Sequence, residues 1–238
     1  MKNNTLKNNT PIDFSDVLTA VVHDMKNSLG LLIQSIETLE QHVPADLEDA
    51  HSHICCTHYE ASRLNSNLVQ LLSLYRTDVQ QLPTTVDFYN IEDLLEDIVT
   101  SHHYYANQKN VSIETNVTSE LHWYLDSELI YLLLNDVLIN ALKYAGKKLI
   151  LTAKVEKNSN GEWLLITVED DGTGYPDVML TSSCDIPSST SIKNGRTGLG
   201  LFFAKLIAHA HENNDRRGKI SLSNGGRLGG SVFSVKLP

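Results

Sequence analysis

Apolar residues recur at alternating steps of four and three positions through two long stretches near the start of the chain. Pro44 and Asp46 separate the two stretches. Such a spacing is a heptad seam, typical of helices that pack along their whole length. We therefore predict two antiparallel helices joined by a short turn, and at ~1.5 Å per residue each seam runs for roughly 40 Å. The seam residues are Leu18, Val22, Met25, Leu29, Leu32, Ile36, Leu39 and Val43, then Leu47, Ala50, Ile54, Thr57, Ala61, Leu64, Leu68, Leu71 and Tyr75.

Two helices alone cannot cover two narrow apolar stripes of this length. We expect the hairpin, residues 16–81, to pair with a second copy and form a homodimeric four-helix bundle. The alternative is that the hairpin packs against the rest of its own chain.

The charge and the cysteine content exclude several classes of protein. Lys and Arg number 19 against 29 Asp and Glu, a formal net charge of −10, so a basic nucleic-acid-binding face is not expected. Three cysteines, with Cys55 and Cys56 adjacent, give no disulfide framework and point to the cytoplasm. The longest apolar run, from Leu129 to Leu134, is too short for a membrane span. Residues 1–15 lack the apolar core of a secretory signal and are expected to be a disordered tail.

Pro83 breaks the helical pattern, and we place a second domain at residues 85–238. Its pattern predicts an α/β sandwich, a largely antiparallel sheet backed by helices on one face. Asn90 and Asp126 are expected N-caps of two helices. The predicted elements are helices to about Lys109 and Tyr144, strands from Val111, at 149–155, 164–168, 219–223 and 231–237, a loop at 177–197, and a helix at 198–211.

Three segments of this domain carry features suited to a nucleotide. Asp170, Gly172 and Gly174 form a D-x-G-x-G turn after a predicted strand, where backbone can approach a ligand closely. Gly198 and Gly200 open a helix whose free N–H groups favour phosphate. Asn140 interrupts an apolar helix face, where a buried amide needs a partner. Each feature alone is weak.

In this order the three segments resemble the ATP-binding domain shared by histidine kinases and gyrase-type ATPases. The resemblance implies that Asp170 accepts a hydrogen bond from the adenine amino group, that Gly172 and Gly174 make room for the base, and that Tyr144 stacks on it. It also implies that Asn140 coordinates Mg²⁺ together with the ATP phosphates and that Lys143 contacts phosphate. The segment that would wrap the phosphates is Arg196, Thr197, Gly198, Leu199 and Gly200.

The first helix carries HDMKNSLG, in which His23 follows seam residue Val22 and should point outward. This stretch resembles the phosphoacceptor box of sensor histidine kinases, H-[ED]-x-[KRT]-[NT]-P-L. The resemblance implies that His23 is the nucleophile, with Asp24 as its general base or orienter. Asn27 matches a position that places water for dephosphorylation of the partner.

The sequence departs from the family pattern at Ser28, which stands at the usual Pro, at Asp136 and Arg196, and in a short lid. No sensor domain fits before Asp16, so we expect input to come from a separate sensor protein, from the hairpin, or not at all. We predict a histidine kinase that autophosphorylates His23 and passes the phosphoryl group to an Asp of a response regulator. The alternatives are a non-catalytic phosphotransfer or scaffold protein and a phosphatase-dominant regulator.

Overall fold

Two compact units, Met1–Leu72 and Ser73–Pro238, make up the chain. The computed structural model describes residues 14–44, 47–76, 82, 84–159, 161–181 and 199–238. Residues 1–13 of the expected tail lie outside the described residues, while its last two, Phe14 and Ser15, belong to a helix. Each unit is considered by itself below.

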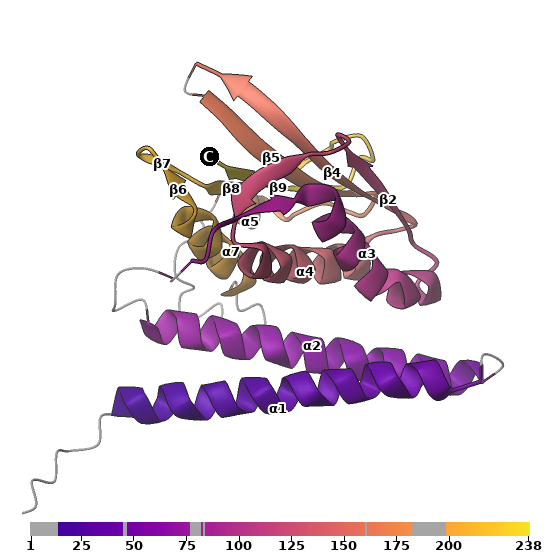
Figure 1. Ribbon diagram of the computed structural model, residues 1–238. Coiled ribbons are helices and arrows are strands. Elements are labelled where there is room, and N and C mark those ends of the chain that lie inside the picture. Colours follow the sequence, from indigo (N-terminus) through magenta and orange to yellow (C-terminus); the bar gives the residue numbers. More distant parts are fainter. Residues whose placement is uncertain (1–13, 45–46, 77–81, 83, 160, 182–198) are drawn as a thin grey trace, which may run out of the picture. The chain divides into compact units, whose positions relative to one another are not determined.

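The first unit is built from helices α1 (Phe14–His42) and α2 (Glu48–Arg76), which run antiparallel (Figure 1). In the turn between them, the Leu47 N–H donates to the carbonyl oxygen of Pro44 at 3.1 Å. Seam residues Ile36 and Ala61 are buried, and His58 Nε2 lies 3.5 Å from Glu37 Oε1 across the two helices. The heptad spacing thus predicted the two helices and their turn correctly.

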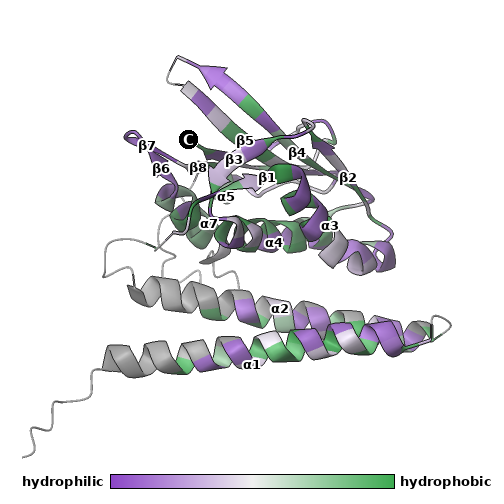
Figure 2. Ribbon diagram, in the orientation of Figure 1, coloured by the Kyte–Doolittle hydropathy of each residue, from purple (hydrophilic) through white to green (hydrophobic). Residues whose placement is uncertain are grey.

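Much of the seam remains exposed in the single chain. Met25, Leu32 and Leu39 of α1 are 48%, 47% and 58% exposed, and Leu47 and Leu64 are each 51% exposed. Figure 2 shows hydrophobic residues along the described part of α1. Burying a leucine side chain stabilises a protein by about 1.5–3 kcal/mol, so this surface has a large unused capacity for packing.

The second unit contains a five-stranded sheet of order β2-β4-β5-β9-β8. Strands β2 and β4 pair parallel, and the other neighbours pair antiparallel, as the largely antiparallel prediction requires. The strands are β2 (Ser112–Val117), β4 (Lys148–Asn158), β5 (Gly161–Asp170), β8 (Lys219–Asn224) and β9 (Ser231–Leu237).

Helices α3 (Ile91–Gln108), α4 (Ser127–Tyr144) and α7 (Leu199–Ala210) cover one face of this sheet (Figure 1). Successive strand residues point to opposite faces, and the inward set of β4 and β5 is almost wholly buried. The core between the layers includes Leu149, Leu151, Ala153, Leu164, Ile166, Val168, Phe233 and Val235. The α/β sandwich predicted from the sequence is confirmed.

Both predicted N-caps are present. Asn90 Oδ1 accepts from the Glu92 N–H at 3.0 Å, and Asp126 Oδ1 accepts from the Leu129 N–H at 3.0 Å. Four short strands were not predicted, because two to four residues are too few to show a period: β1 (Asp87–Asn90) pairs with β3 (His122–Leu125), and β6 (Glu212–Asn213) with β7 (Arg216–Arg217). The predicted loop at 177–197 begins with a helix, α5 (Asp177–Thr181), and residues 182–198 lie outside the described residues.

A buried histidine joins three parts of this unit. His211, the residue that follows α7, has Nδ1 2.8 Å from the carbonyl oxygen of Ile207, and its Nε2 accepts from the Asp126 N–H at 3.0 Å. The Asp126 carboxylate also accepts from the Thr85 N–H at 2.7 Å. Burial lowers the pKa of His211 from 6.5, against the opposing influences of the Ile207 hydrogen bond and the Asp126 charge. The neutral imidazole is therefore the form that fits this network.

This geometry predicts a pH-dependent stability. Since the unfolded chain binds the His211 proton more readily than the folded chain, the free energy of unfolding should fall as the pH drops below about 6.5. The His211→Gln variant lacks this titration and should show a shallower dependence. Urea unfolding at about pH 8 and about pH 5.5 measures both slopes. Equal slopes in the two proteins would contradict the assignment.

Candidate functional site

Asp170 ends strand β5 and lies on the helix-covered face of the sheet, in line with Ile166 and Val168. It is only 2% exposed. Its Oδ1 accepts from the Gly172 N–H at 2.8 Å and from the Ser231 N–H at 3.1 Å, and its Oδ2 accepts from the Ser231 hydroxyl. A buried carboxylate is costly unless hydrogen-bonded, and these donors hold it in place.

The glycine turn after Asp170 brings the backbone against the end of α4. A Cβ at Gly172 would collide with the carbonyl oxygen of Tyr144, so only glycine allows this approach. Gly174 has a φ of +81°. The backbone of the next residue, Tyr175, forms two hydrogen bonds with the Asn224 side chain. The Tyr175 N–H donates to Asn224 Oδ1 at 2.7 Å, and Asn224 Nδ2 donates to the Tyr175 carbonyl oxygen at 2.8 Å. Burial raises the pKa of Tyr175 to about 12, so its phenol stays neutral beside Asp170.

Helix α4 carries the three residues expected to act with Asp170. Asn140 is exposed, which corrects the expectation that it lies on a buried face; the helix turns it away from the apolar side. Its Nδ2 donates to the carbonyl oxygen of Asp136 at 2.9 Å, while its Oδ1 has no hydrogen bond among the described residues. Lys143 Nζ lies 5.3 Å from the ring centroid of Tyr144, which is 60% exposed.

The amide oxygen of Asn140 is a ligand type that suits Mg²⁺. No cluster of three or more His, Cys, Asp or Glu side chains that could hold a metal occurs in the described part of the chain. Mg²⁺ needs oxygen ligands and is usually held by one or two protein groups together with substrate phosphates. The exposed Oδ1 of Asn140 suits that arrangement.

The other predicted site residues are residues 196–200, His23, Asp24 and Asn27. Arg196, Thr197 and Gly198 lie outside the described residues, as does the side chain of Leu199, while Gly200 is half-buried in the first turn of α7. His23 lies in α1, but its side chain is likewise outside the described part. Asp24 and Asn27 of the same helix are exposed.

Two residues that contact Asp170 were not predicted from the sequence. Gly230 lies against Asp170 so closely that a Cβ there would collide with the Asp170 backbone and carboxylate, and Ser231 supplies two of the hydrogen bonds to that carboxylate. The Gly229-Gly230-Ser231 sequence before the last strand was the available signal. Nothing in the sequence alone brings it next to a residue some sixty positions away.

Part of the chain matches a known protein family. Residues 125–238 match the family described as histidine kinase-, DNA gyrase B-, and HSP90-like ATPase. The sensor protein SrrB of Staphylococcus aureus is 23% identical over 230 residues, covering 94% of this chain and 38% of SrrB. The chain therefore spans about two fifths of the length of the curated relatives it matches.

None of the described helices is long and apolar enough to cross a membrane.

Solved structures share the fold at low sequence identity. Full-length ShkA, solved in complex with AMPPNP, matches with a TM-score of 0.63 and 19% identity, covering 94% of this chain and 46% of ShkA. The histidine kinase AdeS of Acinetobacter baumannii matches with a TM-score of 0.57 and 20% identity, covering 90% of this chain and 96% of AdeS. Residues 125–238 thus form a histidine kinase-, DNA gyrase B-, and HSP90-like ATPase domain, in a chain homologous to sensor histidine kinases.

Proposed function

We propose that this protein is an ATP-dependent histidine kinase that phosphorylates its own His23 and passes the phosphoryl group to an aspartate of a response regulator. The observation that carries the proposal is Asp170, a buried carboxylate at a glycine turn beside the exposed end of α4. Homology to sensor histidine kinases along nearly the whole chain supports the same reading.

In this proposal Asp170 selects adenine. Its carboxylate is an acceptor, which matches the amino group of adenine and repels the carbonyl oxygen that guanine carries at that position. The Tyr144 ring would stack on the base. A base that stacks on the face contacted by Lys143 would displace that side chain, and a cation–π contact at an exposed site is worth only about 0.5–1 kcal/mol, so this exchange costs little.

The phosphates and their metal would be held at the same end of α4. The Asn140 oxygen would coordinate Mg²⁺, which would neutralise phosphate charge, and Lys143 would contact a phosphate oxygen. Arg196, Thr197, Gly198, Leu199 and Gly200 are proposed to complete the phosphate site at the start of α7, where helix N–H groups favour anions.

His23 is the proposed phosphoacceptor. An imidazole nitrogen attacks the γ-phosphorus in line, a P–N bond forms, the bond to the β–γ bridging oxygen breaks, and ADP leaves. Asp24 accepts the proton from the imidazole, and Asn27, one helical turn after His23, is proposed to position water for dephosphorylation of the partner. Such a transfer depends mainly on positioning and charge neutralisation.

The proposal includes a homodimer in the cytoplasm, a response regulator receiver domain as the phosphoryl acceptor, and a separate sensor protein as a source of input. The exposed seam of α1 and α2 supports the dimer, because a second hairpin would bury leucines that one chain leaves half exposed.

Incubation of the full chain with γ-radiolabelled ATP tests the kinase. We expect acid-labile, alkali-stable label on the wild-type protein and none on His23→Ala, which should still bind ATP. Asp170→Asn, which keeps the shape but removes the charge, should bind at least about tenfold more weakly. ATP binding without label would favour the phosphatase-dominant regulator, and no ATP binding would favour the scaffold.

The seam predicts which leucine controls dimerisation. Leu32→Glu places a charge on the seam and should convert the dimer to a monomer, because a buried unpaired carboxylate costs several kcal/mol. Leu31→Glu is the matched control, since Leu31 is the adjacent residue, lies off the seam and is 66% exposed. Sedimentation velocity distinguishes the two states. A wild-type monomer, or dimers of both variants, would contradict the proposed bundle.

A further inference from the structure

Three consecutive acidic residues lie at the end of strand β5. Glu169 and Asp170 are the last two residues of the strand, and Asp171 is the residue that follows it. Because strand side chains alternate between faces, Asp170 faces the helices and Glu169 faces the opposite, outer side of the sheet. The proposed nucleotide role uses Asp170 alone. The two flanking carboxylates make contacts of their own, each with a different turn.

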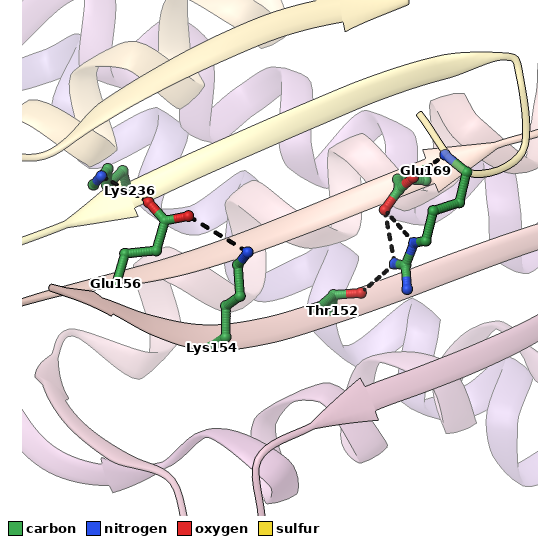
Figure 3. A network of polar contacts seen from close by, with 6 residues as sticks. Thr152, Lys154, Glu156, Glu169 and Lys236 are labelled. Atoms are coloured by element: carbon green, nitrogen blue, oxygen red, sulfur yellow. Dashed lines mark hydrogen bonds and ion pairs between the residues drawn. The ribbon is translucent and has the colours of Figure 1, made fainter. Parts of the chain in front are cut away.

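Glu169 holds the turn between β8 and β9. Its Oε2 accepts from the Arg227 N–H at 2.8 Å, and its Oε1 accepts from Arg227 Nε at 3.0 Å and Nη2 at 2.7 Å. Arg227 Nη2 also donates to Thr152 Oγ1 at 2.6 Å, so the guanidinium contacts residues of two strands, β5 and β4. Figure 3 labels its two side-chain partners, Glu169 and Thr152. Three charge-assisted hydrogen bonds to one nearly buried carboxylate make a strong and directional link.

The turn held in this way reaches Asp170. The Gly230 N–H donates to the Asp170 carbonyl oxygen at 3.1 Å, and Ser231 donates to the Asp170 carboxylate from both its backbone and its hydroxyl. Arg227 stands three residues before Gly230. Its bonds to Glu169 therefore fix the segment that orients the adenine-selecting carboxylate.

Asp171 holds the turn between α4 and β4. Its Oδ1 accepts from the N–H groups of Gly146 at 2.8 Å, Lys147 at 3.0 Å and Lys148 at 3.1 Å, and its Oδ2 accepts from Lys147 at 2.9 Å. Only Ala145 separates these residues from Lys143 and Tyr144. The carboxylate thus ties the end of α4 to the end of β5.

Both flanking groups are ionised at neutral pH. Burial alone would raise the pKa of Glu169, but the hydrogen bonds and charge of Arg227 outweigh it and lower that pKa. For Asp171 the backbone donors of residues 146–148 likewise outweigh burial and lower the pKa. An ionised carboxylate offers only acceptors, which is what these clusters of donors require.

We infer that Glu169 and Asp171 are positioning residues: they fix the two turns on either side of Asp170 and so set the nucleotide affinity of the site. The inference rests on the proposed function for its effect on ATP, and on the hydrogen bonds of the two carboxylates for its effect on the turns. Glu169 acts through residues 225–231, and Asp171 acts through residues 144–148.

The test compares Glu169→Gln and Asp171→Asn in the full chain. Each substitution keeps the side-chain shape but replaces an acceptor with an NH₂ group that faces N–H donors. We expect each variant to bind ATP about tenfold more weakly, the effect of losing one to two charge-assisted hydrogen bonds. Amide hydrogen exchange should become faster at residues 225–231 in Glu169→Gln and at residues 144–148 in Asp171→Asn.

Glu156→Gln is the matched control. Glu156 lies on the same outer face and also pairs with two cations, Lys236 at 2.9 Å and Lys154 at 3.5 Å, but touches neither turn (Figure 3). It should change neither ATP affinity nor exchange in the two turns. Arg227→Lys keeps the charge but not the forked geometry, so its ATP affinity should fall between wild type and Arg227→Met.

The outcomes separate this inference from the proposed function. Unchanged ATP affinity in both flanking variants, or exchange that quickens evenly through residues 85–238, overturns the positioning role. An equal loss of affinity in Glu156→Gln overturns it as well. A wild-type chain that binds no adenine nucleotide overturns the proposed function and the effect on affinity, while exchange confined to the two turns still supports the link between each carboxylate and its turn.

Discussion

A carboxylate placed on the buried face of a sheet must be given hydrogen-bond donors, and the arrangement around Asp170 follows from that requirement. The strand alternation that buries Ile166 and Val168 also carries Asp170 inward at the strand end. Donors reach it from the glycine turn that follows and from the start of β9. The glycine turn also lies against the backbone of Tyr144 at the end of α4, where the side chains of Tyr144 and Asn140 are exposed.

Charged residues on the outer face of the sheet also form contacts at this end of β5. Arg227 lies in a turn 58 residues further along the chain, and it donates hydrogen bonds to Glu169, the residue before Asp170. The second network on that face, formed by Lys154, Glu156 and Lys236, lies further along the strands and joins strands alone. The Glu169–Arg227 contact thus links a turn to the sheet, whereas the Lys154–Glu156–Lys236 network links only residues of strands.

The hairpin unit has a simpler physical basis. Its heptad spacing specifies two long helices, but among the seam residues whose side chains the structure describes, only Ile36 and Ala61 are buried. Leu32, Leu39, Leu47 and Leu64 lie about half exposed, and in the proposed dimer a second copy of the same seam would cover them. His23 falls one position after a seam residue, where the proposed chemistry requires access rather than burial.

The sequence by itself determined the elements whose signals are local. The heptad period predicted both long helices, Asn90 and Asp126 predicted two helix starts, and strand alternation with the turn near residue 160 predicted the β4 and β5 pair. The resemblance gathered Asn140, Asp170 and the glycines as one site. Only the tertiary structure decided that Asn140 is exposed, that Ser231 and Gly230 meet Asp170, and that Arg227 meets Glu169. Those contacts join residues far apart in the chain, and they depend on strand order and register, which no local period encodes.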